Sequence, residues 1–133
     1  MDEILIRPAT LADIPHVLHH RKQMFADIGS GTPAELEGMA LTTAAYLRDA
    51  MPAGSYRGWL AQTADGRIVA GVGIAIAAWP GSPADPAPRR GWVLNVYTEP
   101  EFRRRGIARR LMDALLGWCR AEGFAQLAEQ RLA

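Results

Sequence analysis

The sequence predicts an α/β fold of the α+β kind, in which helices flank a mixed, mostly antiparallel and twisted sheet. Three observations predict it. Apolar residues follow helical spacing in the first part of the chain and strand-like spacing from residue 57 onward. The Asp65-Gly66 pair joins two apolar runs, which is a strong hairpin signal. A strand at residues 91–98 then runs through a short turn into an amphipathic helix at 106–122. The predicted order is therefore strand, helix, helix, strand, strand, strand, helix.

Length and composition are those of one globular unit. The chain has 133 residues, so we expect a single domain over residues 1–133. A hydrophobic content of 49% and a charged content of 22% argue against disorder. Because the net charge is only +1, any cluster of arginines is a local concentration rather than part of a generally basic surface.

The chain carries no mark of secretion or membrane insertion. Its single cysteine, Cys119, cannot form an internal disulfide, and no apolar run approaches the roughly 18 residues that a membrane span needs. The first ten residues contain acids where a secretory signal has basic residues. We therefore expect a cytoplasmic protein without a membrane partner.

The first strand and first helix are marked by a proline and a capping pattern. Residues 3–7 read as a strand that Pro8 ends. Thr10 can cap the following helix, with Asp13 completing the geometry of a capping box, and apolar residues keep helical spacing as far as Phe25. A strand, then a helix, is expected here.

Turn-forming residues separate the remaining elements. Thr32 and Pro33 supply a helix cap and a first-turn proline after a loop. Gly123 is expected to end the last helix. The other expected elements are a helix at 32–50, strands at 57–63 and 68–79, an exposed proline-rich loop at 80–90, and the start of a further strand at 124–127.

The turn before the last helix is built to hold an anion. Five of the eight residues at 103–110 are arginines. Backbone N–H groups in the first turn of a helix lack intrahelical partners, and the helix dipole adds positive charge there. Gly106 permits close approach and Ala108 is small, so a diphosphate could lie across several N–H donors. A solvated helix start and nucleic-acid binding are the alternatives; low net charge and the lack of a second basic stripe disfavour the latter.

These residues resemble a known family. Residues 103–108 match the (Gln/Arg)-x-x-Gly-x-(Gly/Ala) signature of the GNAT superfamily of acyl-CoA-dependent N-acetyltransferases. The flanking segments match as well: a preceding strand at 93–98, Pro-Glu-Phe at 100–102, and Leu-Met at 111–112. The resemblance implies the GNAT fold from its start through its third main helix, with C-terminal elements missing.

The resemblance implies acetyl-CoA as co-substrate and no metal. The pantetheine arm would pair with the strand as a peptide does. Expected pantetheine contacts are Val96, Tyr97 and Thr98, and expected pyrophosphate contacts are Arg103, Arg104, Arg105, Gly106, Ile107, Ala108 and Arg109.

The implied reaction is transfer of the acetyl group to a primary amine, of a small molecule or a protein, by direct attack. The ammonium must first lose a proton, and donors must stabilise an oxyanion. No catalytic residue is identified: some family members have a glutamate early in the strand, where residues 92–95 have none, and alternation leaves open where Glu99, the nearest carboxylate, points. Arg21, Phe25 and Asn95 are the expected substrate-binding residues, although Phe25 fits a core position equally well.

The chain also departs from the family. A GNAT domain usually continues through a strand, a helix and a hairpin, and often supplies a tyrosine that protonates the leaving thiolate; no tyrosine follows Trp118. Three interpretations stay open: a truncated chain, a partner chain that completes the sheet, or a non-catalytic acyl-CoA-binding module. Because open sheet edges associate, a homodimer is expected. Nucleic-acid binding is the weakest alternative.

Two further groups could be mistaken for sites. His16, His19 and His20 have helical spacing, but adjacent histidines point in different directions, so we expect surface or pocket-wall positions rather than a metal site. Cys119 is expected to be a buried, inert thiol.

Overall fold

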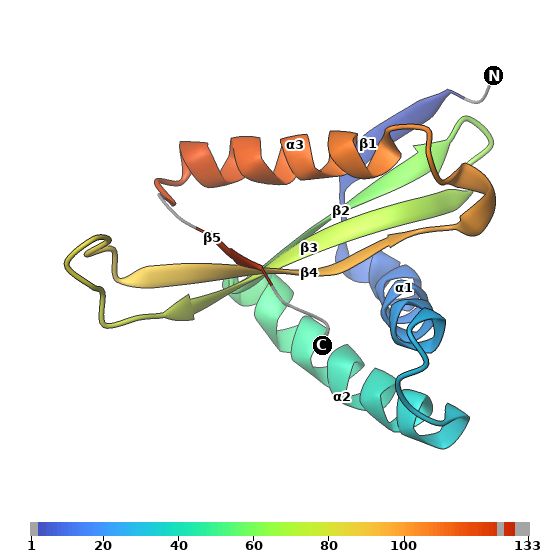
Figure 1. Ribbon diagram of the computed structural model, residues 1–133, viewed down its shortest axis with the longest axis horizontal. Helices are drawn as coiled ribbons and strands as arrows, with labels where there is room; N and C mark the ends of the chain where they lie inside the picture. The colour runs from blue at the N-terminus through green and yellow to red at the C-terminus, as the bar shows by residue number, and fades with distance from the viewer. Residues whose placement is uncertain (1–2, 125–126, 130–133) are drawn as a thin grey trace.

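The computed structural model describes residues 3–124 and 127–129, which form a sheet with helices on both faces (Figure 1). The strands are β1 (Ile4–Pro8), β2 (Tyr56–Thr63), β3 (Ile68–Ala78), β4 (Arg89–Thr98) and β5 (Leu127–Glu129). The helices are α1 (Ile14–Asp27), α2 (Pro33–Ala53) and α3 (Ile107–Ala121), with 3₁₀ turns at Leu11–Asp13 and Pro100–Phe102. The predicted fold class and element order are confirmed.

The strands lie in the sheet in sequence order, and only the last pair is parallel. β1 to β4 are antiparallel neighbours, and β5 adds to β4 in parallel over residues 91–93. The further strand expected from 124–127 begins at Leu127; residues 125 and 126 lie outside the described part. Residues 94–98 of β4 lie beyond the residues that pair with the described β5. The outer edge of residues 94–98 faces the region between the end of α1 and the start of α3.

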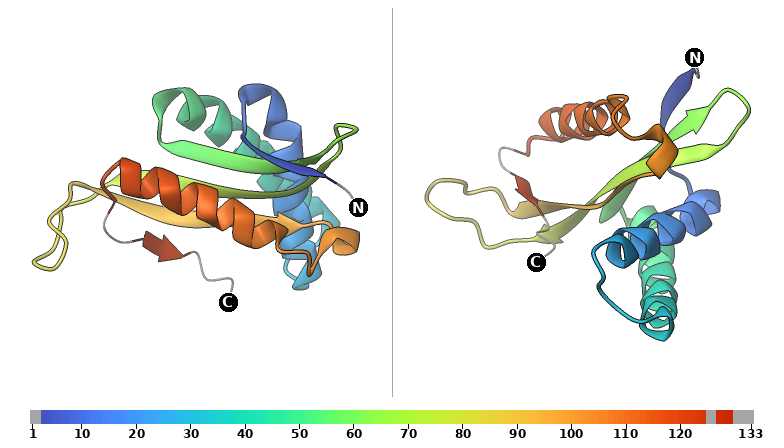
Figure 2. Two further views of the ribbon diagram at one scale, coloured as in Figure 1. Left: turned by 90° about the horizontal axis from the view of Figure 1, so that it is seen from above. Right: turned by 45° about the vertical axis from the view of Figure 1, so that its right-hand side comes forward.

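The two faces of the sheet carry separate cores. α3 lies on one face and packs Leu111, Leu115 and Cys119 against the sheet, and α1 and α2 cover the other (Figure 2). Cys119 is 2% exposed and burial raises its pKa, so the expected inert thiol is where the sequence placed it. Within the described residues, no helix combines the length and apolar character needed to cross a membrane.

Local hydrogen bonds explain where the first two helices begin. The N–H and hydroxyl of Thr10 both donate to the carboxylate of Asp13, and Arg7 holds the same carboxylate at 2.8 Å. The chain first makes a 3₁₀ turn rather than an α-turn, because Pro15 has no N–H to donate to residue 11. Thr32 caps α2 as predicted, in a reciprocal pair with Glu35.

Two glycines of β3 make room for side chains on the α1 and α2 face. A Cβ on Gly73 would collide with the Tyr56 ring, and a Cβ on Gly71 would lie 2.8 Å from Nδ1 of His20. Glycine at these positions therefore lets Tyr56 and His20 lie flat against the sheet, where they are 3% and 2% exposed.

A β-bulge in β4 changes which side chains reach which face. Two residues, Asn95 and Val96, lie opposite the single residue Val72 of β3, and Asn95 has a φ of 59°. Before the bulge, Val93 packs in the α3 core and Leu94 against the α1 and α2 core. An ordinary strand would return the next residue to the α3 side.

After the bulge the alternation is reversed. Asn95 donates a hydrogen bond to the Tyr56 hydroxyl, in the core under α1 and α2. Thr98 pairs with Ala70, which packs in the α3 core. Residues 95 and 97 therefore face α1, while residues 96 and 98 face the side of α3.

Replacing Leu115 by alanine tests the α3 core. Leu115 is fully buried between α3 and the sheet, so Leu115→Ala should lower the free energy of unfolding by about 2–5 kcal/mol. Leu41, which is 75% exposed on α2, provides the matched control. Leu41→Ala should change the free energy of unfolding by less than about 0.5 kcal/mol. Urea unfolding followed by circular dichroism measures both; equal losses would contradict this packing.

Candidate cofactor and acceptor site

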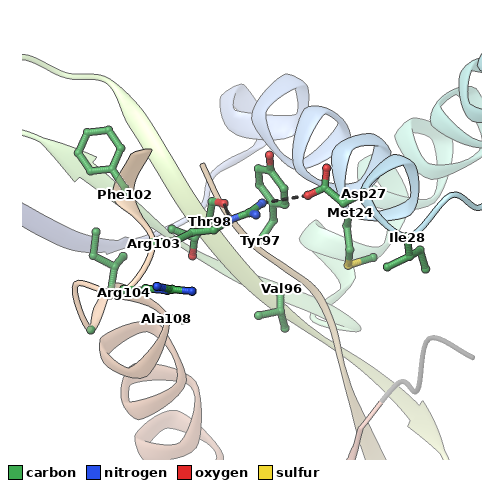
Figure 3. A pocket seen from close by; sticks show the side chains of 12 residues that line it. Met24, Asp27, Ile28, Val96, Tyr97, Thr98, Phe102, Arg103, Arg104 and Ala108 are labelled. Carbon is green, nitrogen blue, oxygen red and sulfur yellow. Dashed lines mark hydrogen bonds and ion pairs between the residues drawn. The ribbon is translucent and has the colours of Figure 1, made fainter. Parts of the chain in front are cut away.

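A pocket of about 470 Å³ opens where the ends of α1 and β4 meet the start of α3 (Figure 3). Each of these three segments supplies one wall. Its lining residues are Met24, Asp27 and Ile28 from α1 and the residue after it, Val96, Tyr97 and Thr98 from β4, and Phe102, Arg103, Arg104, Gly106, Ile107 and Ala108 from the turn and α3. The pocket thus contains most of the residues that the sequence assigned to cofactor binding; Arg105 and Arg109 are the two that do not line it.

The turn presents backbone to the pocket. Arg104 and Gly106 have φ values of 63° and 75°, and α3 begins directly after them at Ile107. The N–H groups of Ile107, Ala108 and Arg109 belong to the first helical turn and have no intrahelical acceptor. A Cβ built on Gly106 meets nothing within 4 Å, so open space lies directly over the backbone. This arrangement can accept an anion against the helix N-terminus.

Arg103 is tied into the protein itself. Its Nε donates to the carbonyl oxygen of Thr98 at 2.8 Å and its Nη2 to the carboxylate of Asp27 at 2.9 Å (Figure 3). The guanidinium also lies 5.4 Å from the centre of the Tyr97 ring. Arg103 therefore links the end of α1 to the end of β4 and forms a wall of the pocket.

The other arginines of the turn have different surroundings. Arg104 lines the pocket, and Arg105 lies 5.0 Å from the centre of the Phe102 ring. Arg109 is exposed on α3. Arg110 donates to the carbonyl oxygen of Ile4 at 2.9 Å and so fastens α3 to β1. The cluster seen in the sequence is divided between the pocket and the scaffold.

The three expected substrate-binding residues contact one another outside this pocket. Nη1 of Arg21 donates to Oδ1 of Asn95 at 2.8 Å, and the guanidinium lies 5.2 Å from the centre of the Phe25 ring. Asn95 is 3% exposed and continues the chain of hydrogen bonds to Tyr56 at 3.0 Å. No sequence motif marks Tyr56, which begins β2.

Glu99 and the histidines gather on the α1 side. Oε1 of Glu99 lies 3.0 Å from Nε2 of His19, so the carboxylate that the sequence left undirected points to α1. His20 is buried under Tyr97, at 5.5 Å between ring centres. Burial, and then the nearby His19 and His16, lower its pKa to about 4, which keeps the His20 ring neutral. Among residues 3–124 and 127–129 there is no group of three or more histidine, cysteine or acidic residues placed to hold a metal ion.

Comparison with known proteins places the chain in a family. The model of the acetyltransferase (GNAT) family matches residues 24–131. The chain therefore belongs to the GNAT acetyltransferases, as the signature at 103–108 predicted. The sequence has no significant match among curated proteins.

Solved structures of the same family share the fold. A GCN5-related N-acetyltransferase from Ralstonia eutropha JMP134 is 30% identical, with a TM-score of 0.89 over 97% of this chain and 84% of that one. A predicted acetyltransferase with acetyl-CoA from Clostridium acetobutylicum is 22% identical, with a TM-score of 0.85 over 97% and 81%. The aminoglycoside N-acetyltransferase AAC(6')-Iy, in complex with the bisubstrate analogue CoA-S-monomethyl-acetylneamine, is 21% identical, with a TM-score of 0.73 over 98% and 80%.

The buried His20 should make stability depend on pH. Its folded pKa of about 4 lies below the ordinary value near 6.5, so the unfolded chain binds the proton more readily. The free energy of unfolding should therefore be unaffected by His20 above pH 6.5 and fall by up to about 3 kcal/mol as pH drops from 6.5 to 4.

Urea unfolding at a series of pH values measures this slope. His20→Gln should remove most of it, whereas His16→Gln, which replaces an exposed histidine that contributes least to the shift, should leave most of it. A slope that survives in His20→Gln would show that another group causes it.

Proposed function

We propose that this protein is an N-acetyltransferase that moves the acetyl group of acetyl-CoA to a primary amine of a small molecule or protein by direct attack. The observation that carries the proposal is the pocket where the backbone at Gly106 and the start of α3 meet residues 96–98 of β4, with which the described part of β5 does not pair. In this proposal residues 1–133 form one domain. The reaction uses no metal ion.

The turn before α3 would bind the pyrophosphate of acetyl-CoA. N–H groups of the first turn of α3 would donate to its oxygens, and the guanidinium of Arg104 would add charge-assisted bonds from the pocket wall. Arg103 would contribute indirectly, because its bonds to Asp27 and Thr98 fix the wall. Arg105 and Arg109, which do not line the pocket, would act through their backbone N–H groups and long-range attraction.

Residues 96–98 are assigned the pantetheine arm. The described residues of β5 pair with residues 91–93 of β4 and not with residues 96–98, whose polar backbone groups lie along the same edge. The two amides of pantetheine can pair with such an edge as a peptide strand would. This direction carries the thioester from the turn toward Asn95.

The chemistry requires a base and an oxyanion donor. The amine nitrogen attacks the thioester carbon, the C–S bond breaks, and the proton lost by the amine balances the one gained by the CoA thiolate. A backbone N–H of β4 is the proposed oxyanion donor. The base is left unassigned, because Glu99 is bonded to His19 and residues 92–95 contain no carboxylate. That observation favours one alternative, a non-catalytic acyl-CoA-binding module.

Two assays separate the candidates. Calorimetric titration with acetyl-CoA should give saturable binding, and release of free CoA thiol across a panel of primary amines should give turnover. Binding without turnover for any amine would favour the binding module, and absence of binding would refute both. A homodimer and a cytoplasmic location, also part of the proposal, are tested by sedimentation and by localisation of the tagged protein.

Gly106→Val tests the turn. A side chain at this position would occupy the open space over the backbone, so acetyl-CoA affinity should fall more than about tenfold. Gly54 is the matched control, because it also has a positive φ, 79°, and open space at Cβ, but it ends α2 away from the pocket. Gly54→Val should cost similar stability by backbone strain and leave affinity unchanged. Undiminished binding by a folded Gly106→Val protein would exclude the turn as the phosphate site.

A further inference from the structure

Arg21 is a half-buried cation that forms no ion pair with any residue in the described part of the chain. Its Nη1 bonds the neutral amide of Asn95, one side of the guanidinium packs on the Phe25 ring, and Nε is buried with no hydrogen-bond partner. Burial lowers the Arg21 pKa, and the nearby Tyr56 and Tyr46 act in the opposite direction. Buried charges in proteins are usually paired, because an unpaired charge loses its hydration and gains no compensating interaction.

The tyrosines beside it cannot supply the missing negative charge. Burial raises the pKa of Tyr56 to about 12 and also raises that of Tyr46, so both phenols stay neutral at physiological pH. The two rings meet edge to face, with their centres 6.1 Å apart. Both phenols interact electrostatically with the Arg21 guanidinium but carry no charge that could balance it.

The carboxylates of the neighbouring elements are committed elsewhere. Within the described part of the chain, four carboxylates in or beside α1, at the start of α2 and directly after β4 form ion pairs. None of these pairs includes Arg21. The pairs are Asp13 with Arg7, Asp27 with Arg103, Glu37 with Lys22, and Glu99 with His19. Among the described residues no carboxylate forms an ion pair with Arg21, so its charge is available to an anionic ligand.

The location identifies which ligand. Asn95, the hydrogen-bond partner of Arg21, directly precedes residues 96–98, along which the pantetheine arm is proposed to run from the α3 turn. Arg21 would then lie at the acyl end of that path, on the α1 face, and far along the strand from the turn assigned to the phosphates. The acceptor amine must approach at the acyl end.

We propose that Arg21 binds a carboxylate of the acceptor, so that the acceptor is an amine that also carries a carboxylate, such as an amino acid, rather than a polycationic amine. The inference rests on the acetyl-transfer function proposed above. A planar guanidinium with donors still available suits a carboxylate, and the same charge repels polyamines and aminoglycosides. The hydrogen bond to Asn95 orients the guanidinium of Arg21, and the Phe25 ring packs against one face of it.

The test compares acceptors that differ only in the carboxylate. Each of the twenty proteinogenic amino acids is assayed for CoA release beside its own amide, with spermidine and kanamycin as polycations. The best amino acid should exceed its amide in kcat/KM by about tenfold to a hundredfold, the range expected for a hydrogen bond to a charged group. Since an amide has the less basic amine and so more free base at neutral pH, amine reactivity alone would favour the amide.

Variants separate recognition from structure. Arg21→Gln should bring the ratio of amino acid to amide close to one, and Arg21→Lys should keep part of it because the charge remains. Arg48→Gln, which removes an exposed arginine of α2, should leave the ratio unchanged. Equal or better use of amides or polycations by the native protein would overturn the proposal, as would an Arg21→Gln variant that loses activity toward acids and amides by the same factor.

A binding measurement keeps this result distinct from failure of acetyl transfer. If no amine is turned over, N-acetyl amino acids are titrated calorimetrically against the native protein and against Arg21→Gln. Binding that is present in the native protein and lost in the variant supports the carboxylate site while the acetyltransferase proposal fails. Absence of binding to both proteins would overturn the carboxylate site as well.

Discussion

The β-bulge at Asn95 is the constraint on which the site depends. One extra residue in β4 reverses the alternation of the strand, so Asn95 points to Tyr56 and Arg21 while Thr98 faces the α3 side. Without the bulge, Asn95 would point into the apolar core under α3 and its amide would lose both partners. The energetic cost of a left-handed asparagine is thereby offset by two hydrogen bonds in a buried region.

Electrostatics divides the molecule into structural and ligand-binding charges. Arg7, Arg103 and Arg110 are bonded to protein oxygens and hold elements together. By contrast, Arg104 lines the pocket and Arg21 lacks an anionic partner among the described residues. Under the proposals above, Arg104 would bind acetyl-CoA at the α3 turn and Arg21 would bind the acceptor at the bulge, with residues 96–98 of β4 between the two cations.

Local chemistry accounts for what the sequence could predict. The caps at Thr10 and Thr32, the Asp65-Gly66 hairpin and the left-handed Gly123 depend on neighbouring residues, and the structure has each of them. The bulge could not be predicted because residues 93–98, Val-Leu-Asn-Val-Tyr-Thr, contain no glycine to mark it, and only the pairing with β3 reveals the extra residue.

The parts that could not be predicted depend on distant partners. Arg103 read as one of five equivalent arginines, but its bond to Asp27 spans 76 positions. The pairs of Arg21 with Asn95 and of His19 with Glu99 span 74 and 80 positions. Arg21, Phe25 and Asn95 were grouped from the resemblance alone; that Arg21 contacts both of the others, and that no carboxylate among the described residues joins them, required the fold.

The central claim is that the turn before α3 and residues 96–98 of β4 together bind acetyl-CoA. Amide chemical-shift changes in a titration of ¹⁵N-labelled protein with acetyl-CoA test it most directly. The account predicts that the largest changes fall on residues 96–98 and 106–109, with Asn95 and Arg21 at the acyl end, and that α2 residues such as Leu41 stay unchanged. Saturable changes confined to the loop at 79–88, with no response in the α3 turn, would contradict it.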